Sequence, residues 1–175
     1  TRLNVEIAPD EAMLEVVLRI RPHTVTLVPE RPGEVTTEGG LDLEAPETEA
    51  LVLTAVRRLS EAGIVVSIFV DPDLRQVTAV KRCGARAIEL NTAAYAEATD
   101  DETRAAELDR IERAGVAAER AGLYVAAGHG LHYHNVEPLA ELGCIAEFNI
   151  GHAIVARAIF SGLDAAVRDM LDLIS

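Results

Sequence analysis

The sequence predicts an α/β fold of the (β/α)8 TIM barrel type, and three observations support this prediction. Six short apolar stretches of strand length alternate with helical stretches, and no hairpin turn joins any two of them, so the sheet should be parallel. The Gly-rich fingerprint that usually follows the first strand of a doubly wound sheet is absent. Gly-His turns instead follow the last two expected strands, where barrels of this type usually bind phosphate.

A complete barrel of this type needs eight strands and about 250 residues. The chain has 175 residues, so we expect a single domain over residues 1–175 that supplies about the last six βα units, the C-terminal three-quarters of a barrel. The chain begins at Thr1 rather than Met and enters a strand almost at once, which we interpret as a missing N-terminal piece. Two missing strands would leave unpaired sheet edges, which are an aggregation hazard.

The first two expected strands enclose one helix and precede a long loop. A strand is expected over residues 3–8, and Asp10 can cap a helix that runs to about Ile20. The second strand covers residues 24–28. Residues 29–43 are rich in Pro, Gly, Thr and Glu, and this segment is too long and polar to be only a connector.

The middle of the chain predicts two further units. Residues 46–62 place apolar side chains on one helical face, and residues 64–70 form a continuous apolar strand. Asp71-Pro72 then opens a helix with Pro at its first position. Residues 86–90 are the next strand.

The last third predicts two more strands and three helical regions. Residues 99–102 fit a capping box before a long helix, and residues 123–127 form the following strand. A helix is expected from about Asn135, and the last strand covers residues 145–150. Residues 152–173 are helical, with a break inside this range.

Composition excludes several classes of protein. Hydrophobic residues make up 49% of the chain and aromatic residues only 3%, which indicates a globular core of Val, Ile, Leu and Ala. The net charge of -13 argues against nucleic acid or an anionic membrane surface as partner. No apolar run has the length of a membrane span. Cys83 and Cys144 form no C-x-x-C motif, and two isolated reduced thiols fit the cytoplasm.

Polar and apolar residues alternate along three of the expected strands, each of which carries a glutamate. The apolar set should face the helices, so Glu6, Glu89 and Glu147 should point into one barrel interior. Neighbouring carboxylates raise one another's pKa, which suits general acid–base chemistry. The alternative is that a structural Lys or Arg neutralises each of them.

His129 is the best acid–base candidate, because a histidine titrates near neutrality and glycines flank this one, so that a ligand can approach. The alternative is a loop histidine that only bonds to the backbone. In the second Gly-His turn, Gly151 and His152 begin a helix, whose unpaired N–H groups suit a phosphate.

Two weaker interpretations concern loops. His132 and His134 follow His129 closely, but three histidines in one loop are a weak sign of a metal site, and we expect none. Thr36 lies in a Thr- and Gly-rich segment whose hydroxyls could bond to a ligand; an ordinary polar loop is the alternative.

Five strings along the chain carry a family resemblance. They read N-V-E-I-A at 4–8, L-V-P-E at 27–30, E-V-T-T-E-G-G-L-D at 34–42, A-G-H-G-L-H-Y-H-N at 127–135 and N-I-G-H-A-I at 149–154. In order and spacing they closely resemble the pyridoxine 5'-phosphate synthase family. The resemblance implies a (β/α)8 barrel that assembles into a homo-octamer. It also implies condensation of 1-deoxy-D-xylulose 5-phosphate with 3-amino-2-oxopropyl phosphate, without a metal or organic cofactor.

The same resemblance assigns roles to individual residues. It implies that Glu6 is a general base, that His129 is a proton donor and that Glu89 stabilises the transition state. The residues that it implies for contacts to substrate are Thr36, Gly130, Gly151 and His152.

The chain departs from the family pattern at its start. In the family, two strands that precede the N-x-E-x-A motif carry another catalytic histidine and further substrate-binding residues. The expected interior is acidic although both implied substrates are phosphorylated, and Arg19, Arg57 and Arg58 lie on helices that face away. We therefore expect this chain alone to be inactive. A metal-dependent aldolase or hydrolase acting on a phosphorylated substrate and a non-catalytic phosphate-binding fragment stay open as alternatives.

Overall fold

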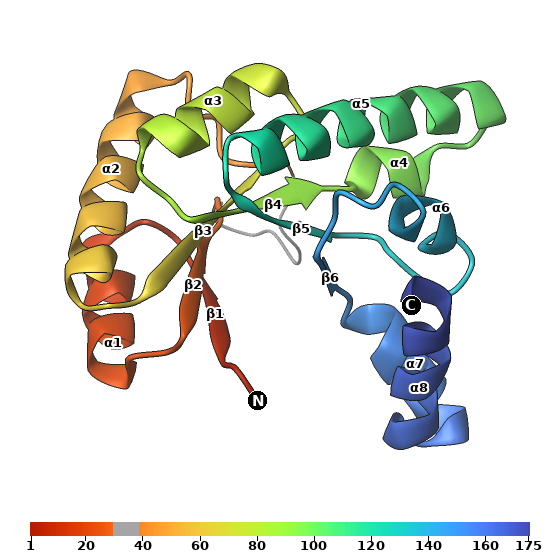
Figure 1. Ribbon diagram of the computed structural model, residues 1–175. Coiled ribbons are helices and arrows are strands. Elements are labelled where there is room, and N and C mark those ends of the chain that lie inside the picture. The colour runs from red at the N-terminus through yellow and green to blue at the C-terminus, as the bar shows by residue number, and fades with distance from the viewer. Residues whose placement is uncertain (30–38) are drawn as a thin grey trace.

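Six parallel strands form one curled sheet in the computed structural model of the chain, which describes residues 1–29 and 39–175 (Figure 1). The strands pair in sequence order from β1 to β6, and helices follow them along the outside of the curl. Within the described residues, β1 and β6 are the two edges of the sheet. The prediction of an α/β barrel-type fold with six βα units is confirmed.

The strands lie within about two residues of their predicted limits. They are β1 Asn4–Ile7, β2 Thr24–Leu27, β3 Val65–Val70, β4 Ala87–Asn91, β5 Tyr124–Gly128 and β6 Glu147–Asn149.

The helices follow the predicted order, with one addition. They are α1 Glu11–Ile20, α2 Pro46–Glu61, α3 Leu74–Arg82, α4 Ala93–Glu97, α5 Asp101–Arg120, α6 Glu137–Ala140, α7 His152–Ser161 and α8 Leu163–Ile174.

Three of the helices begin at an aspartate whose side chain accepts a hydrogen bond from a backbone N–H of the first turn. Asp10 caps α1 as predicted. Asp73 caps α3, so the prediction that Asp71-Pro72 opens this helix was wrong. Asp100 caps α5 in place of the predicted capping box at residues 99–102. In each case a carboxylate satisfies a donor that the helix itself leaves free.

Parallel pairing places apolar side chains in rows on the outer face of the sheet. Ile7, Leu27, Ile68, Ile88 and Val125 lie side by side on neighbouring strands, and all five are buried. Burial of each such side chain contributes about 1.5–3 kcal/mol. This face therefore anchors the helices, and the opposite face is free to carry the polar residues.

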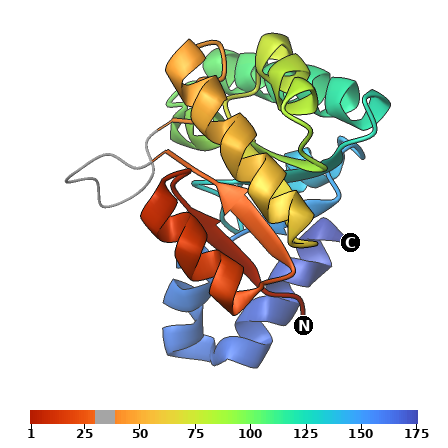
Figure 2. The same ribbon diagram turned by 90° about the vertical axis from the view of Figure 1, so that its left-hand side faces the viewer.

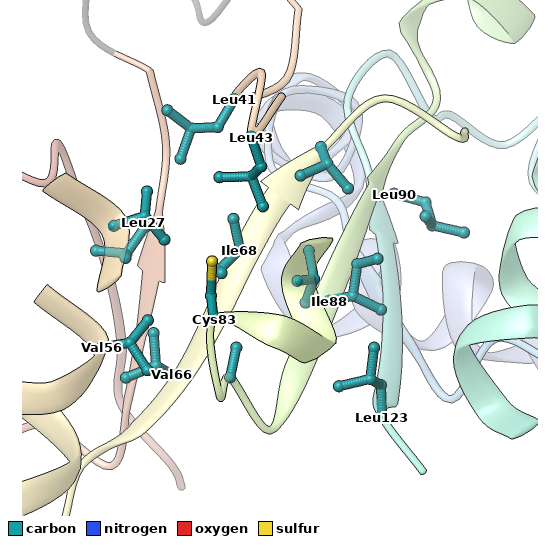
Figure 3. Packing of buried hydrophobic residues seen from close by; sticks show 14 of the residues in the cluster. Leu27, Leu41, Leu43, Val56, Val66, Ile68, Cys83, Ile88, Leu90 and Leu123 are labelled. Atoms are coloured by element: carbon teal, nitrogen blue, oxygen red, sulfur yellow. The ribbon is translucent and has the colours of Figure 1, made fainter. Parts of the chain in front are cut away.

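Helices cover the outer face of the sheet. Figure 3 shows Val56 of α2 and Cys83, which follows α3, packed over Val66 and Ile68 of β3. Figure 2 shows α1 and α2 side by side on the outer face near β1 and β2. The core consists of aliphatic side chains, as the low aromatic content predicts.

The last two helices keep apolar side chains in solvent. On α7, Ile159 is 77% exposed and Phe160 is 93% exposed, and Leu163 and Leu171 of α8 are also exposed. Several large apolar side chains exposed on two adjacent helices are typical of an interface. Among the described residues, no helix combines the length and the apolar character that a membrane crossing requires.

Candidate active site

The three residues predicted to be catalytic line one cavity of about 430 Å³ inside the curl of the sheet. Glu6 comes from β1, Glu89 from β4, and His129 directly follows β5. Gly151 and His152, at the start of α7, line the same cavity. Strands far apart in the sequence thus bring two carboxylates, an imidazole and a helix N-terminus to one place.

Glu89 is the most deeply buried of these carboxylates, with 4% of its surface exposed. Burial raises the pKa of this carboxyl from 4.5 to about 7; a hydrogen bond from Asn149 offsets part of the rise, and the charges of Glu6 and Glu147 add to it. Within the described part of the chain, its Oε2 atom has no hydrogen-bond partner. A buried carboxyl that is poised near neutrality can both give and take a proton.

Gly128, the last residue of β5, leaves room for this carboxyl. A Cβ atom at Gly128 would lie 2.5 Å from Oε1 of Glu89, which is too short, and 3.1 Å from Cβ of Asn149, which is tight. The absence of a side chain therefore lets Glu89 lie directly against the neighbouring strand. From the sequence, Gly128 was predicted only to open access to His129. Asn149 was not among the predicted site residues, although the alternation of polar residues along β6 could have indicated it.

His129 has a φ of 85°, which is rare for a residue with a side chain. The imidazole lies beside Phe69 of β3, with 6.4 Å between the ring centroids. Phe69 therefore forms one wall of the cavity next to the imidazole.

Two features of the backbone at Gly130 require a residue without a side chain. Its φ is 74°, and a Cβ there would lie 2.6 Å from Cβ of Ala96 in α4. Gly130 lines a second cavity of about 770 Å³, which also contains Glu6, His129 and His152. Because the two cavities share these residues, they form one opening, which we call the mouth.

Gly151 is the N-cap of α7, a helix of ten residues that has no side-chain cap. The first N–H groups of a helix lack partners within the helix and carry a partial positive charge. The predicted helix start is present, and N–H groups of this kind suit a phosphate group.

Glu147 faces the same interior but lies apart from His129. It lines a further cavity of about 820 Å³ that also contains Arg2 and Arg86 and that shares Glu89 with the first cavity. The hydroxyl of Tyr124 lies 3.3 Å from its Oε2 atom. The prediction that three glutamates point into one interior holds, although Glu147 does not line the cavity that contains the imidazole.

Two histidines of the loop that follows His129 lie beside each other. His132 accepts a hydrogen bond at Nδ1 from the backbone N–H of His134, and their ring centroids are 5.8 Å apart. Among the described residues, no three His, Cys, Asp or Glu side chains are placed to hold a metal ion together. Thr36 lies outside the described residues.

Cations are scarce around the mouth. Among the described residues that line its two cavities, none is a lysine or an arginine. Arg58 of α2 is engaged elsewhere, in ion pairs with Glu11 and Glu15 of α1 at 2.6 Å and 2.5 Å. In this part of the structure, the partial positive charge at the start of α7 is the feature most suited to an anion.

Solved structures support the barrel-type fold. 3-Hexulose-6-phosphate synthase matches with a TM-score of 0.61 and 14% identity over 96% of this chain and 70% of that protein. A structure titled native KDPGal matches with a TM-score of 0.60 and 12% identity over 98% of this chain and 68% of that one. At such low identity the likeness shows the fold alone.

Sequence comparison identifies the family. A relative named pyridoxine 5'-phosphate synthase from Geobacter sulfurreducens is 51% identical over 174 residues, which are 99% of this chain and 72% of the relative. The relative of the same name from Pelobacter propionicus is 49% identical over the same shares. The family model described as "Pyridoxal phosphate biosynthesis protein PdxJ" matches residues 1–175. The chain therefore belongs to the family of pyridoxal phosphate biosynthesis protein PdxJ.

Proposed function

We propose that the protein is a pyridoxine 5'-phosphate synthase, which condenses 1-deoxy-D-xylulose 5-phosphate with 3-amino-2-oxopropyl phosphate to give pyridoxine 5'-phosphate, phosphate and water. Relatives that bear this enzyme's name are about half identical to the chain over nearly its whole length. The observation that carries the proposal is the single mouth that contains Glu6, Glu89, His129 and the start of α7.

In the proposed reaction, each of these groups has its own role. The amine of one substrate condenses with the ketone of the other, and Glu6 then removes a proton from carbon. In its protonated form, which a pKa of about 7 makes available, Glu89 donates a hydrogen bond to the negative charge that develops. His129 protonates the leaving hydroxyl or phosphate. Enolisation requires a base, and dehydration requires an acid, within hydrogen-bonding reach of the reacting atoms.

Substrate binding is assigned to the glycine turns. Gly151 and His152 offer backbone N–H groups to a phosphate at the start of α7, and Gly130 lets the substrate approach the backbone. Thr36 is proposed as a further contact on the strength of the family resemblance. No metal or organic cofactor is assigned a role.

The remaining proposals concern partners and location. The net charge of -13 argues against nucleic acid and anionic membrane as partners. Small phosphorylated molecules are proposed instead because the start of α7 suits a phosphate. A homo-oligomer, an octamer by family resemblance, fits the exposed apolar residues of α7 and α8, and sedimentation velocity of the native protein tests it. Two free cysteines, Cys83 and Cys144, fit a cytoplasmic location.

The substitution Glu6→Gln in the native protein tests the proposed function. We expect ring closure to slow by about 100-fold or more, because a general base contributes about 10²–10⁴-fold. Formation of pyridoxine 5'-phosphate measured by chromatography checks this, and calorimetric binding of inorganic phosphate should change little.

Glu61→Gln, which alters an exposed carboxyl on α2, is the control and should leave turnover unchanged. Turnover close to that of the unaltered protein in Glu6→Gln would contradict the role of Glu6. Failure of the unaltered native protein to form the product would contradict the proposed function itself.

A further inference from the structure

The turn that carries His129 is held by a buried residue of a different strand-to-helix connection. Thr92 follows β4 directly, and its surface is 0% exposed. Its hydroxyl lies 2.8 Å from the carbonyl oxygen of Gly128 and 2.6 Å from that of His129. Its backbone N–H also donates to Gly128, at 2.9 Å. The hydroxyl has one proton, and the shorter of its two contacts is the one to the carbonyl of His129.

The backbone of His129 needs such support. A residue with a side chain at a φ of 85° is strained by about 1–3 kcal/mol, and it stays there only when its surroundings fix it. With the carbonyl of His129 held by Thr92, the peptide unit after the histidine cannot rotate freely. The direction in which the imidazole leaves the backbone is set by the same torsion angles.

Other hydrogen bonds hold the end of the turn that follows His129. The side chain of Asn135 donates to the carbonyl of Gly130 at 3.1 Å and accepts from the N–H of His132 at 2.7 Å. The hydroxyl of Tyr95, in α4, donates to the carbonyl of Asn135 at 2.9 Å. Residues 92–96 therefore contact the histidine turn at both of its ends, since Ala96 also packs against Gly130.

We propose that Thr92 is a positioning residue for the reaction: its hydroxyl holds the strained backbone of His129, so that the imidazole points into the mouth shared with Glu6 and Glu89. Thr92 does not line either cavity of the mouth and acts only through His129. The effect on catalysis rests on the proposed role of His129, whereas the effect on the backbone does not.

Two substitutions separate the hydroxyl from the shape of the side chain. Thr92→Val keeps the branched shape and removes the donor, while Thr92→Ser keeps the donor. In the native protein we expect Thr92→Val to lower kcat by about 10- to 100-fold, as for a displacement of about 1 Å at a reacting group. KM should change less than threefold, and Thr92→Ser should retain most of kcat. Thr78→Val, which removes an exposed hydroxyl from α3, is the control and should match the unaltered protein.

A double-mutant cycle with His129→Gln tests whether Thr92 acts through the histidine. If it does, Thr92→Val causes no further loss of kcat in the His129→Gln background. A further loss of tenfold or more in that background would overturn the proposal, as would an unchanged kcat in Thr92→Val alone. An equal loss of kcat in Thr92→Ser and Thr92→Val would also overturn it, because packing rather than the hydroxyl would then be responsible.

A crystal structure of Thr92→Val supplies a readout that does not depend on activity. We expect His129 to leave the region near φ 85° or its imidazole to occupy more than one orientation. Retention of the original φ and of one orientation would overturn the proposal even if the protein proves to catalyse another reaction. If Thr92→Val does not fold, the same measurements on Thr92→Ala apply with the same expected results.

Discussion

Glu89 is buried beside two other carboxylates, and burial gives its carboxyl a pKa of about 7. The sequence predicted that the side chain of Glu89 points into the interior, because polar and apolar residues alternate along β4. The degree of burial was not predictable, since it depends on Gly128 and Asn149 from two other strands. Among residues 1–29 and 39–175, one oxygen of this carboxyl has no hydrogen-bond partner, which is costly to the fold and useful to the reaction.

This pKa has a consequence for stability. The folded protein binds the proton of Glu89 more tightly than the unfolded chain, so stability falls as pH rises from 4.5 to about 7 and stays lower above that range. The difference between the pKa of Glu89 in the unfolded and in the folded protein corresponds to about 3 kcal/mol. We therefore expect the substitution Glu89→Gln to raise the free energy of unfolding more at pH 8 than at pH 5, by up to that amount. Urea unfolding of the variant and of the unaltered protein at both pH values measures this.

Glu61→Gln, at an exposed position, is the matched control for this comparison and should show no such difference. A difference of similar size in both variants, or none in Glu89→Gln, would contradict the account of Glu89.

At the scale of elements, the hydrophobic pattern predicted the strands and the long helices, because burial of an apolar face decides them. It did not predict α4, a five-residue helix that has too few turns to be stable alone. Tyr95 holds this helix by burying its ring and bonding to Asn135, and neither contact can be inferred from nearby sequence. The predicted N-caps of α3 and α5 were misplaced, because the sequence offers several aspartates close to the start of each helix.

The cap of α1 gives a test at this scale. Asp10 accepts a hydrogen bond from the N–H of Met13 at 2.9 Å. We expect Asp10→Ala to lower the free energy of unfolding by about 1 kcal/mol, because a first-turn donor loses its partner. Asp10→Asn keeps an acceptor and should change it by much less, as urea unfolding of both variants will show. Equal losses in the two variants would mean that charge, not capping, is responsible.

At the scale of the whole molecule, strand order places β1, β4, β5 and β6 around one interior. The alternation of polar residues predicted which side chains face that interior. It did not predict that Glu147 would lie apart from the imidazole. Strands in a barrel tilt and are staggered, so residues in one row of the sheet lie at different heights along the axis. Glu89, Ala126 and Glu147 form such a row.

The central claim is that Glu6, Glu89 and His129 act on one substrate whose phosphate is bound at the start of α7. A crystal structure of the native protein with 1-deoxy-D-xylulose 5-phosphate tests it most directly. We expect the phosphate to accept hydrogen bonds from the backbone of Gly151 and His152, and the carbon chain to lie between the two carboxylates and the imidazole. A substrate bound away from these three side chains, or a phosphate held far from α7, would contradict the account.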